Sequence, residues 1–243
     1  MIDIRHVSKS YAKGRVKAVD DLVLTVRPGE IFGFLGPNGA GKTTTIKLIV
    51  GLLKPDAGTI AINGLDTQTD ALACKAMTTY VPDTPAVYER LTGLEYLNFI
   101  GDVYGVPKAA RLARIGKWLE IFELTAAVGS PIQSYSHGMK QKIVLTAALL
   151  PAPRVMVLDE PMVGLDPRSA HHLKELMREH CDQGGTLFFS THIMEVAERL
   201  CDRIGIISKG RLIACGTMDE LKAGGSGEAG ASLESIFLEL TEP

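Results

Sequence analysis

The segment Gly36–Thr43 constrains this chain of 243 residues more than any other feature of its sequence. It matches the pattern GxxxxGK[ST], directly after an apolar strand predicted at 30–35 and before a helical run. Its glycines let the backbone curl so that several N–H groups point at phosphate oxygens, and the following helix adds its positive N-terminal end. We expect Lys42 to reach the β- and γ-phosphates and the Thr43 hydroxyl to ligate magnesium. The alternative, a glycine-rich turn that matches by chance, is disfavoured by the flanking strand and helix.

A second phosphate-handling signal lies at Val155–Glu160, an apolar run that ends in two acids. Asp159 is expected to hold magnesium through water, because a hard cation prefers oxygen ligands. Glu160 follows at a position where a general base could polarise the attacking water. A strand whose acidic end is merely solvated is the alternative, and the nearby phosphate-loop pattern favours the first interpretation.

Apolar runs bounded by turn signals predict strands along most of the chain. The dipeptides Pro28-Gly29, Asn63-Gly64 and Lys209-Gly210 supply such turns. The first strands follow one another closely, as in an antiparallel layer, whereas the later strands alternate with helical segments, which favours a parallel sheet. The predicted class is therefore α/β with an antiparallel addition. The predicted strands lie at 2–7, 21–26, 30–35, 59–62, 78–81, 155–159, 186–190, 203–208 and 211–215.

Between residues 84 and 152 the apolar positions change to the period of a helix. This change predicts a helical insertion between two strands. The glycine-rich segment 224–230 has the composition of a linker, and a short amphipathic piece follows it at 233–240. The helix-period positions include Leu94, Leu97, Ile100, Leu112, Ile115, Leu119 and Phe122.

Charge and apolar content disfavour several classes of function. The formal net charge of −2 supplies no basic field for a nucleic-acid backbone, so we expect no nucleic-acid partner. No stretch approaches the roughly 18 apolar residues needed to span a bilayer, which predicts a soluble, cytoplasmic chain and leaves room for a membrane-embedded partner. The four cysteines lack metal-ligand or redox-motif spacing, so we expect them to be reduced core residues.

With these motifs in this order, the chain resembles the ATP-binding subunits of ABC transporters over nearly its whole length. The segment Ser134–Gln141 stands where that family carries its LSGGQ signature, shortly before the strand with the two acids. Val163–Asp166 is similar to the family's D-loop, and Phe188–His192 looks like the strand that bears its switch histidine. Two further segments, Val87–Glu95 and Ser232–Leu240, look most like exporter-type cassettes.

The resemblance implies a P-loop NTPase fold with a RecA-type parallel sheet core, an antiparallel β subdomain and an α-helical subdomain that carries the signature. It divides the chain into an ATP-binding core with the antiparallel layer at 1–83 and 153–223, a helical subdomain at 84–152, and a linker with a C-terminal helix at 224–243. ATP and Mg²⁺ are the implied ligands. The loop residues expected to bind the nucleotide are Gly36, Asn38, Gly39, Ala40, Gly41, Lys42, Thr43 and Thr44.

In this family two cassettes pair head to tail, and each nucleotide lies between the phosphate loop of one and the signature of the other. Ser136 can cap a helix that begins near Gly138, so its hydroxyl and the helix N-terminus would face a γ-phosphate held by the partner. Asp166 is expected to act across the same interface, with an ordinary N-cap before Pro167 as the alternative. Whether the pair is a homodimer or a heterodimer stays open.

The resemblance assigns roles to two more residues. Tyr11 takes the place of the aromatic that stacks on adenine, and a strand-end tyrosine packed on the sheet is the alternative. His192 is expected to contact the γ-phosphate and orient water, forming a catalytic set with Glu160 and Lys42; a structural histidine is the alternative.

Two departures from the family pattern occur. Asp83 takes the place of a glutamine that follows a strand, and its carboxylate can still ligate magnesium together with Thr43 and Asp159. Because this side chain is shorter and negatively charged, coupling of its loop to the helical insertion is expected to differ. The signature reads Tyr-Ser-His-Gly-Met and keeps Ser136 and Gly138, the residues that the phosphate chemistry needs.

These features predict a motor subunit, in which ATP hydrolysis by a cassette dimer powers transport by a separate, polytopic transmembrane permease. The chain would then be peripheral on the inner face of the cell membrane. A soluble ABC ATPase that acts on nucleic acid or the ribosome is disfavoured, because coiled-coil insertions, a second cassette and a basic patch are missing. Glu160 and His192 argue against a regulatory module that binds ATP without turnover, although Asp83 keeps that alternative open.

Overall fold

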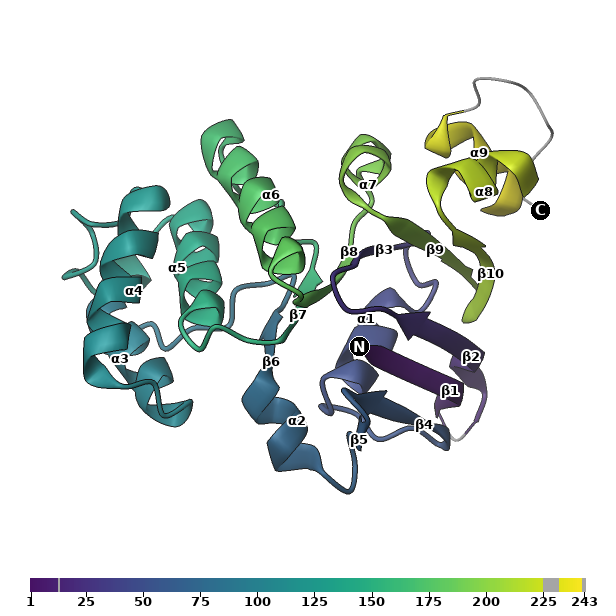
Figure 1. Cartoon of the computed structure of the whole chain (residues 1–243), viewed down its shortest axis with the longest axis horizontal. Coiled ribbons are helices and arrows are strands. Elements are labelled where there is room, and N and C mark those ends of the chain that lie inside the picture. Colours follow the sequence, from purple (N-terminus) through teal and green to yellow (C-terminus); the bar gives the residue numbers. More distant parts are fainter. Residues whose placement is uncertain (13, 225–231, 242–243) are drawn as a thin grey trace.

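The computed structural model describes residues 1–12, 14–224 and 232–241, and their strands form two sheets (Figure 1). The strands are β1 (Ile2–Tyr11), β2 (Val16–Val26), β3 (Ile31–Leu35), β4 (Ala57–Ile62), β5 (Leu65–Asp66), β6 (Thr78–Val81), β7 (Val155–Asp159), β8 (Thr186–Ser190), β9 (Arg203–Ser208) and β10 (Arg211–Gly216). One sheet is antiparallel, in the order β2-β1-β4-β5. The other has the order β10-β9-β3-β8-β7-β6 and is parallel except between β9 and β10. The predicted α/β class with an antiparallel layer is confirmed.

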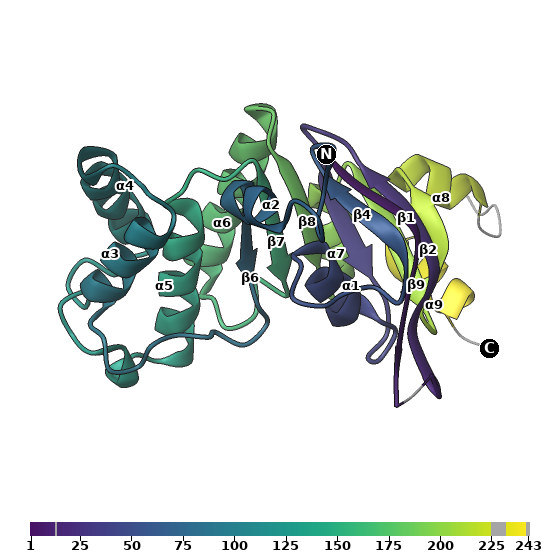
Figure 2. The same cartoon turned by 90° about the horizontal axis from the view of Figure 1, so that it is seen from below.

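The helices cover the parallel sheet on both faces, and one of them lies between the two sheets (Figures 1 and 2). They are α1 (Lys42–Ile49), α2 (Ala71–Met77), α3 (Gly93–Val103), α4 (Lys108–Ile121), α5 (His137–Leu149), α6 (Pro167–Asp182), α7 (Met194–Leu200), α8 (Met218–Gly224) and α9 (Leu233–Thr241), with a short 3₁₀ turn at Ile132–Ser134. In both views α3, α4 and α5 lie together at one end of the molecule, away from the antiparallel sheet. Helix α1 packs between the sheets.

Strand β7 shows why the strands of the parallel sheet appear in the sequence as continuous apolar runs. Val155 and Val157 pack in the core around α1, while Met156 and Leu158 pack in the core beneath α5 and α6. Successive side chains of a strand point to opposite faces, and both faces are covered here, so the whole strand is buried. Because β7 is buried on both faces, its last residue, Asp159, is held at the edge of a rigid sheet.

The helical insertion predicted between 84 and 152 contains α3, α4 and α5. A capping box starts α3, because the Thr92 side chain accepts from the Glu95 N–H while the Glu95 carboxylate accepts from the Thr92 N–H. Of the helix-period positions, Leu97 and the series from Ile115 to Phe122 are buried, whereas Leu94 and Leu112 are exposed.

Several elements differ from the expectations. Strands β1 and β2 are longer than predicted, and neither β5 nor α2 was predicted. The turns at Asn63-Gly64 and Lys209-Gly210 are confirmed, with positive φ at all four residues. Residues 225–230 of the predicted linker lie outside the described residues, and the amphipathic piece at 233–240 falls on α9.

The four cysteines are free, and Cys215 is exposed, so the expectation that all four lie in the core is wrong for that residue. Cys215 lies on β10, at the edge of the sheet, and its thiol accepts a hydrogen bond from the Arg203 guanidinium. Among the described residues, no helix combines the length and the apolar character needed to cross a bilayer.

Candidate nucleotide-binding site

The segment Gly36–Thr43 runs from the end of β3 into the start of α1. Gly41 has a φ of 113°, a conformation that glycine adopts without steric cost. The loop also lies close to its neighbours, since a Cβ on Gly36 would clash with the Ile207 carbonyl and one on Gly41 with the Ala18 carbonyl. The glycines therefore allow the loop to pack closely between β2 and β9.

Lys42 is the first residue of α1 and turns back over the loop. Its Nζ donates to the carbonyl oxygens of Gly36, at 2.6 Å, and Pro37, at 3.3 Å. Burial lowers the pKa of Lys42, and the carboxylates of Glu160 and Asp159 oppose part of this shift. The ammonium group is thus confined between loop carbonyls and two acids, where phosphate oxygens could replace the carbonyls as acceptors.

Asp159 ends β7 and has an exposed fraction of only 1%. Its Oδ1 accepts a hydrogen bond from the Ser190 hydroxyl, while its Oδ2 has no hydrogen-bond partner in the described part of the chain. Burial raises the pKa of Asp159, and the hydrogen bond from Ser190 offsets part of the shift. A buried carboxylate oxygen without a partner is costly, so this atom is suited to a cation or a bound water.

The donor set around Asp159 fits a magnesium ion that arrives with its nucleotide. Proteins hold Mg²⁺ at phosphate-transfer sites with one or two carboxylates, and substrate phosphates and water complete the shell. The predicted ligands Thr43, Asp83 and Asp159 all line one cleft, and Oδ2 of Asp159 is free to accept a cation. Within residues 1–12, 14–224 and 232–241 there is no group of three or more His, Cys, Asp and Glu residues that could hold a metal ion.

Glu160 begins the segment after β7 and has a φ of 49°, in the left-handed region that a non-glycine residue seldom adopts. Its N–H bonds to the Ser190 carbonyl and hydroxyl, at 3.2 and 3.1 Å, which secure this backbone. Its Oε2 lies 2.9 Å from Nδ1 of His192, which follows β8. The Glu160 side chain is mostly buried, whereas that of His192 is 63% exposed. One carboxylate oxygen is therefore oriented by a histidine at the surface.

The cleft that these groups share encloses about 250 Å³. Tyr11 and His192 do not line it, although His192 contacts Glu160. Of the predicted loop residues, Gly36 and Ala40 do not line it either, and Ala40 is buried. Ala18 also lines the cleft. It was not predicted from the sequence, because nothing distinguishes a small residue inside β2 as part of a binding site. The lining residues are Ala18, Pro37, Asn38, Gly39, Gly41, Lys42, Thr43, Thr44, Asp83, Asp159 and Glu160.

The structure brings the predicted residue Asp83 to the cleft but leaves Tyr11 outside its lining. Asp83 follows β6 and lines the cleft, with its Oδ1 accepting from the Thr84 N–H at 2.8 Å. Tyr11 ends β1 opposite Val16, and its side chain is 42% exposed. Tyr11 is thus partly open to solvent.

The signature segment starts helix α5 elsewhere on the chain. Ser136 is its N-cap, and the Ser136 hydroxyl accepts from the Met139 N–H at 3.2 Å, as the sequence predicted. The helix begins at His137, one residue before the expected start near Gly138. Neither Ser136 nor Gly138 lines the cleft of its own chain. The phosphate loop and the signature of one chain therefore do not face the same cavity.

Asp166 is the N-cap of α6 and is followed by Pro167. This is the geometry of the alternative that the sequence analysis gave for Asp166. Its carboxylate accepts from the N–H and hydroxyl of Ser169, at 2.9 and 2.8 Å. It also forms an ion pair with Lys142 of α5, at 2.7 Å. The Lys142 bond, and then those from Ser169, hold the pKa of Asp166 well below its usual range. Lys142 was missed, because nothing in the sequence pairs it with Asp166.

The segment between Glu160 and Asp166 is also fastened to α5 by close packing. The Gln141 amide donates to the Pro161 carbonyl at 3.3 Å. A Cβ on Gly138 would come within 2.6 Å of the Gly164 carbonyl oxygen, and one on Gly164 within 3.0 Å of Nε2 of His137. The signature helix and this loop therefore fit together only because both positions are glycines.

The sequence profile of the family described as "ABC transporter" matches residues 19–163 of the chain. The chain belongs to the ABC transporter family. It is 35% identical over 242 residues to the ABC-type transporter ATP-binding protein EcsA of Bacillus subtilis (strain 168), a match that covers 100% of this chain and 97% of EcsA. It is 39% identical over 236 residues to the Nod factor export ATP-binding protein I of Paraburkholderia xenovorans (strain LB400), covering 97% and 76% of the two chains.

A solved structure described as the ATP-binding subunit of an ABC transporter is similar over the whole fold of this ABC subunit. The TM-score is 0.94 at 37% identity, and the match covers 99% of each chain. The expected P-loop NTPase fold is thereby confirmed, and the chain is an ABC transporter ATP-binding subunit, a class of protein that binds ATP.

Proposed function

We propose that this ABC subunit binds ATP with Mg²⁺ in the cleft beside the phosphate loop and hydrolyses it to ADP and phosphate. One observation carries the proposal: the Lys42 ammonium, the unpartnered Asp159 oxygen and the Glu160 carboxylate beside His192 converge on one cleft. A cation, a metal ligand and a base are the groups that transfer of a phosphoryl group to water requires.

Each of these side chains has a distinct task in the proposed reaction. Lys42 exchanges its loop carbonyls for the β- and γ-phosphates, and the loop N–H groups bind the remaining phosphate oxygens. Glu160 accepts a proton from the attacking water, while His192 orients the Glu160 carboxylate and contacts the γ-phosphate. Magnesium, held by Thr43, Asp83 and Asp159, supplies charge neutralisation at the phosphates when it is bound.

The active form in this proposal is a head-to-tail pair with a second cassette, either an identical or a similar chain. Ser136 and Gly138 point to this pairing, because they present a capped helix N-terminus but do not line their own cleft. Asp166 would lie near the same contact surface. Tyr11, with its exposed ring, would stack on the adenine of the nucleotide.

A separate transmembrane permease is the proposed partner for transport. The proposed helical subdomain at 84–152 and the proposed core at 1–83 and 153–223 both contribute to an apolar groove of about 500 Å³. We propose that a short helix of the permease occupies it, which would hold the subunit on the cytoplasmic face of the membrane. The groove is lined by Val50, Leu52, Leu72, Lys75, Ala76, Thr78, Tyr80, Val103 and Tyr104.

Export is the proposed direction of transport. One similar protein is named for Nod factor export, and the segments Val87–Glu95 and Ser232–Leu240 resemble exporter-type cassettes. Nucleic acid is not proposed as a partner, in keeping with the net charge of −2.

The deciding experiment compares Glu160→Gln with the control Glu120→Gln, an exposed glutamate of α4. We expect Glu160→Gln to lower ATP turnover by about a hundredfold or more, because a general base is lost. The same variant should still form dimers that depend on Mg-ATP, as measured by light scattering. Turnover at the wild-type rate in Glu160→Gln would show that Glu160 is not the base. Dimers without turnover in the wild-type chain would instead support a regulatory ATP-binding module.

A further inference from the structure

Helix α7 follows the proposed catalytic residue His192 and has little packing of its own. It begins at Met194, two residues after His192, and has seven residues. Among residues 194–200, all of which the structure describes, only Ala197 is buried, and the N-cap Ile193 makes no side-chain cap hydrogen bond. A helix of two turns is not stable by itself in water. Another element is therefore needed to hold α7 in place.

The C-terminal helix α9 packs against α7. Leu233 and Ile236 lie one turn apart on α9 and have exposed fractions of 0% and 2%. Both belong to an apolar cluster that also contains Ala197 of α7. The cluster therefore joins the end of the chain to the helix that follows His192. Its other buried members are Leu35, Ile204, Ile206 and Leu221.

The strands beneath this cluster are fixed independently of α9. Leu35 is the last residue of β3, and Ile204 and Ile206 belong to β9. Strand β3 is paired with β8 and β9, and β9 is paired with β3 and β10, so each has a neighbouring strand on both sides. A loss of contact with α9 would therefore affect α7 before it affects the sheet.

Polar contacts between these helices are long. The Glu198 carboxylate of α7 lies 3.6 Å from Nζ of Lys222 on α8, and it accepts from the Leu233 N–H at 3.5 Å. A hydrogen bond of this length and a partly exposed ion pair contribute little to stability. Burial of Leu233 and Ile236 is therefore the main attachment of α9 to its neighbours.

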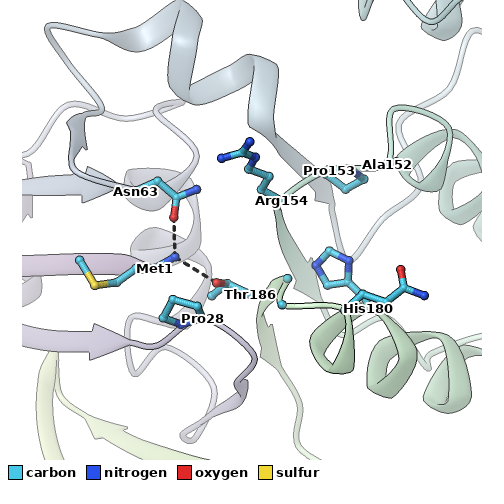
Figure 3. A pocket seen from close by; sticks show the side chains of 11 residues that line it. Met1, Pro28, Asn63, Ala152, Pro153, Arg154, His180 and Thr186 are labelled. Carbon is cyan, nitrogen blue, oxygen red and sulfur yellow. Dashed lines mark hydrogen bonds between the residues drawn. The ribbon is translucent and has the colours of Figure 1, made fainter.

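Strand β8, which leads to His192 from the other side, is secured separately. All five of its residues are buried. Figure 3 shows its first residue, Thr186, whose hydroxyl accepts a hydrogen bond from the Met1 amine at 3.0 Å. The same amine donates to Oδ1 of Asn63 at 2.7 Å, which connects β8 to the antiparallel sheet. His192 therefore lies between a firmly held strand and a short helix that packs on α9.

We infer that α9 positions His192 beside Glu160, and that Leu233 and Ile236 are positioning residues that act through α7. The 2.9 Å contact between Nδ1 of His192 and Oε2 of Glu160 requires the chain after β8 to keep its course, and α7 fixes the far end of that segment. The consequence for catalysis rests on the proposed function, in which His192 orients the Glu160 carboxylate. The consequence for structure does not.

The structural test follows amide hydrogen exchange of the full chain by mass spectrometry. In Ile236→Ala we expect the amides of α7 to exchange about tenfold faster or more, because opening of α7 no longer breaks a packed cluster. The amides of α1 should keep their wild-type rates. Ile236→Leu, which conserves the apolar volume, should restore protection of α7.

Two controls separate this effect from a general loss of stability. Ile115→Ala makes the same deletion on α4, at a residue that is 4% exposed and lies in another apolar cluster. Thr186→Val removes the hydroxyl that secures the beginning of β8. Neither control should accelerate exchange in α7.

The functional test compares ATP turnover in single and double variants. Ile236→Ala alone should lower the turnover number by about tenfold, with little change in the ATP concentration at half-maximal rate. In a His192→Ala background the same substitution should cause no further loss, because both changes act on the same group.

The outcomes distinguish this inference from the proposed function. Wild-type exchange of α7 in Ile236→Ala, while α9 itself exchanges faster, would overturn the inference. A double variant whose loss of turnover equals the product of the two single losses would also overturn it. If Ile236→Ala fails to fold, the smaller deletion Ile236→Val decides by the same selective rise in exchange. Selective exchange of α7 in a chain whose wild type does not hydrolyse ATP would refute the proposed function and support the positioning of His192 by α9.

Discussion

Oε2 of Glu160 lies 2.9 Å from Nδ1 of His192, although the two residues are 32 positions apart in the sequence. They meet because β7 and β8 are neighbouring parallel strands, and each residue follows the carboxyl end of its strand. The proposed base thus takes its orientation from a residue on another strand.

Replacement of His192 by Ala should lower the turnover number by about tenfold to a hundredfold, because the Glu160 carboxylate loses the group that orients it. The concentration of ATP at half-maximal rate should change much less. Steady-state kinetics with Mg-ATP would measure both quantities. His172→Ala, on the surface of α6, serves as the control, and an equal loss in both variants would contradict a specific role for His192.

Replacement of Ser136 by Ala should weaken dimer formation with Mg-ATP while leaving ATP binding to the monomer unchanged. The loss of the N-cap should also lower the free energy of unfolding by about 1 kcal/mol. Equilibrium sedimentation and nucleotide titration separate the two effects. Ser134→Ala is the nearby control, since the Ser134 hydroxyl donates to the Pro131 carbonyl and to no other acceptor in the described part of the chain. Equal dimerisation of both variants would argue against the proposed signature contact.

A charge in the apolar groove should block the proposed permease contact. Leu52→Glu places a carboxylate at a groove residue that is 58% exposed, so folding should be little affected. Leu112→Glu is matched to it, because Leu112 is 56% exposed on α4 and does not line the groove. The fraction of the subunit that sediments with membranes of its own cells should fall for Leu52→Glu only. A parallel fall in both would point to a general loss of stability.

Stability should depend on pH through Asp166. Its folded-state pKa is lowered, so its contribution to the free energy of unfolding is complete above the ordinary aspartate pKa of about 4 and is lost as the pH falls through the folded-state value. Asp166→Ala should therefore lower the free energy of unfolding by about 1 kcal/mol at neutral pH, and the difference between the variant and the wild type should narrow in acid. Urea unfolding across this pH range measures the difference. Asp70→Ala is the control, because the Asp70 side chain makes no cap hydrogen bond in α2; an equal, pH-independent loss would refute the assignment.

Two of the strands that are buried on both faces, β7 and β8, could be predicted to the residue. Residues 155–159 and 186–190 match β7 and β8, because continuous burial requires a continuous apolar run. Strand β5 has two residues and α2 has seven, too short for either to show a periodic pattern. These short elements form through packing with the rest of the fold rather than through local sequence preference.

The site could be predicted in part, because the phosphate-loop pattern and the two acids are local in sequence. Contacts between distant segments could not. The pair Lys142–Asp166 and the packing of His137 on Gly164 arise only when α5 lies beside the segment after β7. Sequence reasoning placed Asp166 at a helix start but gave no means of finding its cationic partner.

The attachment of the Glu160–Asp166 segment to α5 has a consequence for how a pair of cassettes would work. The segment begins at the proposed base of one nucleotide site, and the N-cap of α5 is Ser136, the serine that would complete the other site. Any shift of Glu160 on loss of the γ-phosphate would move the Glu160–Asp166 segment. Through Gln141, Lys142 and Gly164, that movement would reach α5 and its N-terminal serine. The two ATPs of a dimer should therefore be consumed cooperatively, with the rate rising more steeply than a single-site saturation curve.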